Sequence, residues 1–79
     1  MDELRSSNRL VGVKQSKRAI KDGQVKRAFL ALDAEERILQ PLRELCAEQS
    51  VQVTEVDTMV GLGDACGIEI GAAVAVILN

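Results

Sequence analysis

The sequence has no histidine, tryptophan or tyrosine, and Phe29 is its single aromatic residue. Histidine is the usual proton shuttle and a common metal ligand, and aromatic rings provide most base stacking, so the usual residues for these roles are missing. Cys46 and Cys66 have no further cysteine or histidine to complete a zinc site, and we expect two buried thiols. The serines have no histidine to activate them. We therefore expect neither an enzyme nor a metal or cofactor site.

The length of 79 residues corresponds to one small domain, and we expect a single domain over residues 1–79. A composition that is 47% hydrophobic and 28% charged is typical of a folded globular chain. The longest apolar run, residues 72–78, is far shorter than the roughly 20 residues that span a bilayer. The first five residues lack the basic and apolar pattern of a signal peptide. We expect a cytoplasmic protein that makes no membrane contact.

The charges are segregated along the chain. Residues 1–27 carry eight basic and three acidic side chains, a balance of +5, whereas residues 28–79 carry two basic and nine acidic side chains, a balance of −7. A protein with one basic pole and an acidic body can steer a polyanion toward one face. The alternative interpretation is a solvated basic surface without a function.

The hydrophobic periods alternate between those of strands and helices. We expect strands at 9–12, 25–32, 51–54 and 72–78, a short helical start at 2–7 and helices at 13–21 and 41–48. Asp33 is suited to cap the segment that follows it, and Pro41 predicts a turn at 35–38 followed by a new helix. Glycines at 61, 63, 67 and 71 are expected to interrupt the helical spacing that begins at Val56. This order predicts an α/β protein, a three-layer α/β/α sandwich around a mixed sheet of about four strands.

The first motif is Gly12-Val13-Lys14-Gln15-Ser16-Lys17-Arg18, at a predicted strand-to-helix junction. The start of a helix presents unpaired N–H groups that attract anions. On the helix, Lys14, Lys17, Arg18 and Lys21 fall at i, i+3, i+4 and i+7 and form one basic stripe. Arginine and lysine match the acceptors of guanine, and glutamine can both donate to and accept from a base. The motif is a candidate nucleic-acid site.

The second motif is Leu62-Gly63-Asp64-Ala65-Cys66-Gly67-Ile68-Glu69-Ile70-Gly71. It is not a dinucleotide-binding fingerprint, because Cys66 stands where the third glycine of that pattern is required. Ile68 and Ile70 alternate with Glu69 just before a predicted buried strand. Either both isoleucines are core residues, or the segment is a loop that exposes them to a partner.

Together, residues 12–23 and 62–73 resemble the ribosomal L-seven-Ae and L-thirty-e family, and short bacterial members look closest. The resemblance extends to residues 31–34 and 41–46 and so covers nearly the whole chain. It implies an α/β/α sandwich that binds kink-turn RNA, a sharply bent duplex with tandem sheared G·A pairs beside a short bulge.

The resemblance also implies roles for particular residues. Lys14 and Gln15 stand where the family reads the sheared guanines, and Arg18 stands where a basic side chain reaches guanine and phosphate. The loop at 68–70 stands where the family packs on bulge nucleotides, and Glu35 is a weaker match to a residue that meets an extruded base. The basic stripe adds two phosphate contacts. The candidate RNA-binding residues are therefore Gly12, Lys14, Gln15, Lys17, Arg18, Lys21, Glu35, Ile68, Glu69 and Ile70.

The chain departs from the family pattern at Lys14–Gln15, where archaeal and eukaryotic members most typically have Asn-Glu. Lys-Gln occurs in the L-thirty-e branch and in short bacterial members, so RNA binding remains the expectation. The expected partner is a structured RNA with a kink-turn, in ribosomal RNA, a riboswitch or a leader RNA, bound by a monomer. The alternative is a protein-interaction adaptor on the same fold that docks through Ile68, Ile70 and the acidic surface at 35–48.

Overall fold

The computed structural model describes residues 2–5 and 8–79. Its elements in chain order are η1 (Asp2–Arg5), β1 (Arg9–Val11), α1 (Val13–Lys21), β2 (Val25–Ala31), α2 (Glu36–Glu48), β3 (Gln52–Val56), α3 (Met59–Ala65) and β4 (Val74–Leu78). The helical start expected at 2–7 is a 3-10 helix at Asp2–Arg5, and the rest of that expectation, at 6–7, lies outside the described residues. No helix in the described part of the chain is long and apolar enough to cross a membrane.

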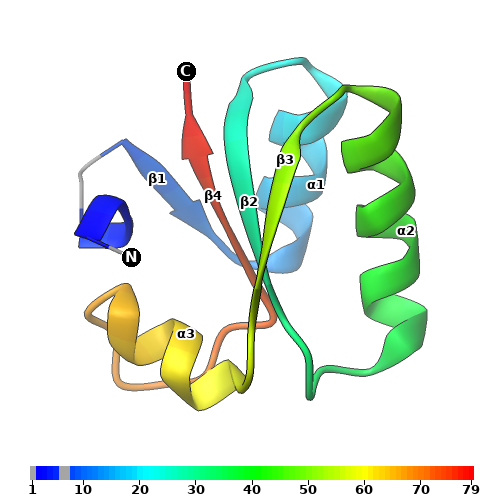
Figure 1. Cartoon of the computed structure of the whole chain (residues 1–79). Helices are drawn as coiled ribbons and strands as arrows, with labels where there is room; N and C mark the ends of the chain where they lie inside the picture. The colour runs from blue at the N-terminus through cyan, green and yellow to red at the C-terminus, as the bar shows by residue number, and fades with distance from the viewer. Residues whose placement is uncertain (1, 6–7) are drawn as a thin grey trace.

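The four strands form one sheet in the order β1-β4-β2-β3. Strand β4 runs antiparallel to both of its neighbours, β1 and β2, whereas β2 and β3 are parallel. Four of the five residues of β4 are buried, as a strand covered on both faces requires. The prediction of a mixed sheet of about four strands is confirmed (Figure 1).

Two hydrophobic clusters lie on opposite faces of this sheet. The first joins the sheet to α1 and α2, through Ala19, Ile20, Leu39, Leu42 and Cys46. The second joins it to η1 and α3, through Leu4, Leu62 and Cys66 beneath Phe29 and Ile77. The α/β/α sandwich predicted from the sequence is therefore confirmed, and both thiols are buried. Complete burial of one of these leucines contributes about 1.5–3 kcal/mol.

Helix α2 does not have the boundaries that the sequence predicted. It runs without a break over Glu36–Glu48, so the expected turn at 35–38 and the new helix at Pro41 are wrong. Proline removes one backbone hydrogen bond, whose acceptor would be the carbonyl of Arg37, four residues earlier. Arg37 is exposed, so water can satisfy its carbonyl oxygen. Burial of Leu39 and Leu42 then keeps the helix intact.

Helix α3 continues through two glycines that were expected to interrupt it. Thr58 caps the helix, because its Oγ1 accepts a hydrogen bond of 2.9 Å from the Gly61 N–H. Gly63 is buried, and a Cβ at this position would collide with the carbonyl oxygen of Ile70. The glycine therefore allows the loop after α3 to pack directly on the helix backbone.

The sequence predicted that Asp33 caps the helix that follows it, but Asp33 does not cap α2. The N-cap of α2 is Glu35, which makes no side-chain capping bond. The Oδ1 of Asp33 instead accepts a hydrogen bond of 2.7 Å from the N–H of Met59, the first residue of α3. Asp33 thus satisfies a helix start on a different element, 26 residues away.

Candidate functional site

Three segments that carry predicted site residues meet at one end of the sheet, where β4 begins. The Gly12 N–H, at the start of α1, donates to the Val74 carbonyl at 3.2 Å. The Ala31 N–H, at the end of β2, donates to the Ala73 carbonyl at 2.9 Å. Strand β4 is entered from the loop after α3, so that loop, the start of α1 and the β2–α2 connection border one another. Figure 1 shows them at the lower end of the sheet.

Gly12 forms the junction between β1 and α1. Its φ of 115° lies in a region that side chains rarely adopt. A Cβ there would lie 2.8 Å from the Oε1 of Gln15, so the Gln15 side chain folds back over the glycine. Gln15 is nevertheless exposed, and the first amides of α1 have no acceptor within the helix. The junction therefore offers backbone donors beside a side-chain amide.

The basic stripe on α1 is present as the sequence predicted. Lys14, Lys17, Arg18 and Lys21 are all exposed, while Ser16, Ala19 and Ile20 face the core. Among the side chains that the structure describes, those of residues 4, 5 and 8–79, none pairs with these four cations. Helical rise puts Lys21 about 10 Å along the axis from Lys14, toward the opposite end of the sheet. The stripe thus starts at the site and leads away from it.

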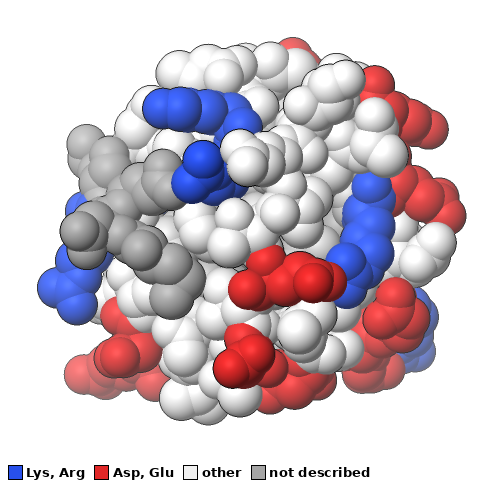
Figure 2. All heavy atoms as spheres, viewed as in Figure 1, with Lys and Arg blue, Asp and Glu red and all other residues white. Residues whose placement is uncertain are grey.

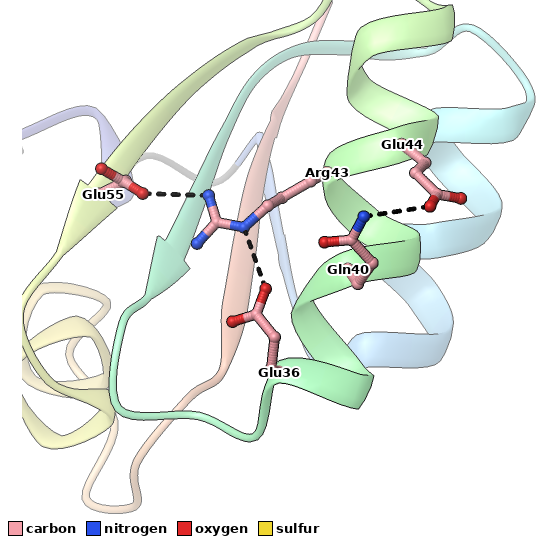
Figure 3. Close-up of polar contacts among 5 residues, drawn as sticks. All are labelled: Glu36, Gln40, Arg43, Glu44 and Glu55. Carbon is pink, nitrogen blue, oxygen red and sulfur yellow. Dashed lines mark hydrogen bonds and ion pairs between the residues drawn. The ribbon is translucent and has the colours of Figure 1, made fainter.

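The two basic residues of the acidic segment are in a different situation. Arg43 Nη1 lies 3.0 Å from Glu55 Oε2, and its Nε lies 3.8 Å from Glu36 Oε1, so it joins α2 to β3 (Figure 3). Arg37 Nε lies 2.7 Å from Glu35 Oε2 on the exposed surface. Glu35 therefore sits at the site end of the sheet with its carboxylate already paired.

The acidic side chains gather on other surfaces. Figure 2 shows the face that carries α3, with Asp and Glu along its lower part and right-hand side, over α3, β3 and α2. Helix α1 packs on the opposite face of the sheet from α3. The acidic side chains of α3 thus lie on the other face of the sheet from the cations of α1, whereas those of α2 lie on the α1 face, so a polyanion would be directed toward α1 itself.

The loop after α3 begins with a tight helix ending. Gly67 has a φ of 77°, its N–H donates to Asp64 at 2.9 Å, and the Ile68 N–H donates to Gly63 at 3.0 Å. This pair of bonds is a Schellman motif. Ile68 is partly buried against the core cluster under α3, whereas Ile70 is 74% exposed. Ile68 is therefore a core residue, as one of the two interpretations of the sequence predicted, and Ile70 is exposed on a loop, as the other predicted.

Beside this loop lies an open groove that the sequence analysis did not identify. It has a volume of about 540 Å³ and is lined by Arg5, three residues of α3 and the loop at 67–71. Val60 forms part of its wall and is 74% exposed. The sequence did contain a signal for this exposed wall. Val60 and the charged Asp64 are four residues apart, so the apolar side chain shares one helix face with a charged one.

The Cys46 thiol lies in the core, away from this surface. Burial raises the pKa of the Cys46 thiol above its ordinary value, so this sulfur stays protonated and inert near neutral pH. In the described ranges, no three side chains among His, Cys, Asp and Glu gather where they could hold a metal ion. The candidate site is a surface of cations, amides, the two glutamates Glu35 and Glu69 and the exposed Ile70, an arrangement that suits binding.

A family model and several known proteins are similar to this chain. The model of the Ribosomal protein L7Ae/L30e/S12e/Gadd45 family matches residues 2–79. An RNA-binding protein of Caldanaerobacter subterraneus subsp. tengcongensis is 39% identical over 75 residues, covering 95% of this chain and 92% of that protein. The large ribosomal subunit protein eL8 of Halobacterium salinarum is 37% identical over 68 residues, covering 85% of this chain and 57% of that protein.

A solved structure has the same fold. The 15.5kD RNA binding protein of Giardia lamblia superposes with a TM-score of 0.90, covering 99% of this chain and 69% of that protein. Its sequence identity is 19%, so this likeness concerns the fold alone.

Proposed function

Since the chain belongs to the Ribosomal protein L7Ae/L30e/S12e/Gadd45 family, we propose that it is an RNA-binding protein that recognises and stabilises kink-turns with tandem sheared G·A pairs. The whole of residues 1–79 acts as one RNA-binding domain in this proposal. The protein has no enzymatic activity and acts as a cytoplasmic monomer. Its RNA is a ribosomal RNA, on which it would be ribosome-associated, or a riboswitch or leader RNA.

One observation carries the proposal. The start of α1 and the loop after α3 lie 50 or more residues apart in the sequence, yet both border the start of β4. One of them offers exposed cations without acidic partners among the described residues, and the other offers an exposed aliphatic side chain. A bent duplex with a bulge presents both phosphate-lined guanine edges and unstacked bases within a short distance.

The proposed contacts follow from this arrangement. Lys14 and Gln15 read the sheared guanines, together with the backbone amides of α1 that directly follow Gly12, and Arg18 reaches guanine and phosphate one turn further along. Lys17 and Lys21 bind phosphates of the adjoining arm, because the stripe continues along the helix axis. Ile68, Glu69 and Ile70 cover the bulge, with Ile70 making the main contact. Glu35 contacts an extruded base once its carboxylate has left the ion pair with Arg37.

Ordinary duplex RNA cannot be read in this way. The major groove of A-form RNA is deep and narrow, so side chains reach its base edges only where a kink opens it. Recognition here therefore depends on shape, guanine edges and an aliphatic contact, and it does not require aromatic stacking. A chain with one buried aromatic residue is compatible with that mode.

The test is a titration of the protein into a short RNA duplex that contains a consensus kink-turn. The control duplex has Watson–Crick pairs in place of the sheared G·A pairs, and both are measured at two salt concentrations. We expect tight binding to the first duplex, weak binding to the second, and a steep loss of affinity with added salt.

Equal, weak binding to both duplexes would refute kink-turn recognition and leave a general electrostatic surface. Affinity for a protein partner that barely changes with salt would instead favour the adaptor function, through Ile68, Ile70 and the acidic surface at 35–48. The exposed Ile70 and Val60 are what such a partner would cover.

A further inference from the structure

Arg9 belongs to the basic pole of the sequence, but it points away from the basic stripe. It pairs with Ile77 across the β1–β4 ladder, and paired residues of antiparallel strands lie on the same face of the sheet. Ile77 belongs to the cluster under α3, so Arg9 lies on the α3 face and α1 lies on the other. Its Cα is about 10 Å along β1 from Gly12. Arg9 is therefore not part of the basic stripe on α1.

The Arg9 guanidinium reaches the end of α3. Its Nη2 donates a hydrogen bond of 2.7 Å to the carbonyl oxygen of Cys66, in a partly buried setting. Cys66 is the C-cap of the helix, where carbonyl groups lack partners and the helix dipole favours a cation. The two residues are 57 positions apart, so this bond ties an edge strand to the helix end.

The position of the exposed loop depends on that helix end. The loop begins at Gly67, directly after Cys66, and returns where the Ala72 N–H donates to the Met59 carbonyl at 3.0 Å. Between these two points, the carbonyl of Ile70 lies against Gly63. A helix of seven residues is too short to be stable by itself, so contacts with its neighbours hold it in place.

We propose that Arg9 is a positioning residue, whose guanidinium holds the end of α3 and thereby fixes the loop at 67–71 in the conformation that receives RNA. Asp33 holds the other end of the same helix through the Met59 N–H. The two charged side chains thus secure the two ends of a short helix, one from β1 and one from the β2–α2 connection, and neither is among the proposed RNA contacts. The RNA part of this inference rests on the proposed function, whereas the anchoring part concerns the free protein.

The anchoring is tested first, by amide hydrogen exchange of the free protein. Arg9→Met keeps the aliphatic stem and removes the donor, and we expect the amides of Gly67, Ile68 and Ala72 to exchange about tenfold faster or more. The amides of β2, the strand that pairs with both β3 and β4, should keep their rates and so report that the fold is intact. Arg9→Lys should restore part of the protection, because an ammonium group can also donate to the carbonyl.

The matched control is Lys26→Met, which removes the same charge from an exposed residue of β2. It should leave the exchange of the loop amides unchanged. Wild-type exchange rates at 67–72 in Arg9→Met, or equal changes in the two variants, would overturn the proposal.

RNA binding then separates positioning from direct contact. For Arg9→Met we expect about tenfold weaker binding of the kink-turn duplex at every salt concentration, with the salt slope unchanged. A slope that falls by about one would mean that Arg9 binds a phosphate, and this would also overturn the proposal. Failure of the wild-type protein to bind the duplex would refute the proposed function alone, because the exchange experiment would still decide whether Arg9 anchors the loop.

Discussion

The start of α1 and the loop after α3 border the same end of the sheet, but they are built in opposite ways. On α1 the functional groups are exposed charges on a regular helix, and their backbone is fixed by local hydrogen bonds. On the loop the functional group is the exposed Ile70, and its backbone is fixed by contacts with α3 and, through α3, with β1 and the β2–α2 connection.

This difference separates two ways in which binding can fail. Removing a cation from α1 leaves the fold unchanged and alters affinity through electrostatics, which salt reports. Disturbing the packing around α3 leaves the charges unchanged and alters affinity through the shape and stability of the loop, which salt does not report. The two halves of the surface should therefore respond to different substitutions.

The largest effect should come from Gly63→Ala. The added Cβ meets a backbone carbonyl, that of Ile70, and neither partner is the flexible end of a side chain. We expect a loss of about 3 kcal/mol in the free energy of unfolding, measured by denaturant titration. The control is Gly67→Asn, because that site is open and asparagine tolerates a left-handed φ. An equal loss in both variants would show that the collision with Ile70 is not the cause.

The next effect in size is expected from Arg18→Ala, on the other half of the surface. Loss of a guanine and phosphate contact should weaken binding of the kink-turn duplex by about 1–3 kcal/mol, with no change in the free energy of unfolding. Isothermal titration calorimetry with the same RNA measures this loss of affinity. The matched control is Lys26→Ala, which removes an exposed cation outside the proposed site. Unchanged affinity for Arg18→Ala would remove this residue from the site.

The same contrast explains which features the sequence could predict. Helix α1 has the predicted bounds of 13–21, because its signals are local: the apolar spacing, the basic stripe and the glycine after its end. The charge segregation and the layers of the sandwich also follow from patterns within short windows.

Features fixed by distant contacts were not predictable. Gly63 argues against a helix when only the sequence is considered, and its reason, the Ile70 carbonyl beside it, is visible only in the fold. Asp33 stands just before α2 yet accepts from the first amide of α3, and Arg9 looks like one more cation of the basic pole yet binds the end of a helix. In each of the three cases, the residue that explains the structural role lies at least seven positions away in the sequence. Hydrophobic periodicity reports only closer neighbours, so it cannot reveal such a partner.

A smaller effect should follow from Ile70→Ser, which tests the loop without disturbing its packing. The side chain is 74% exposed, so the free energy of unfolding should change by less than about 0.5 kcal/mol. Affinity for the kink-turn duplex should fall by about 1 kcal/mol at every salt concentration. Val60→Ser is the matched control, because Val60 is equally exposed on the neighbouring helix. Equal losses would extend the contact surface from the loop into the groove beside α3.

The smallest effect should come from Lys21→Gln, at the far end of the basic stripe. Two helical turns separate Lys21 from Lys14, so Lys21 can reach only the phosphates of the RNA arm that leads away from the kink. The slope of log affinity against log salt should become shallower by about one, while the preference for sheared G·A pairs over Watson–Crick pairs stays the same. Lys14→Gln should reduce that preference as well, because Lys14 is proposed to read guanine. If Lys21→Gln reduced the preference too, the stripe would be reading the kink along its whole length, and the distinction between a reading end and a phosphate-binding end would be wrong.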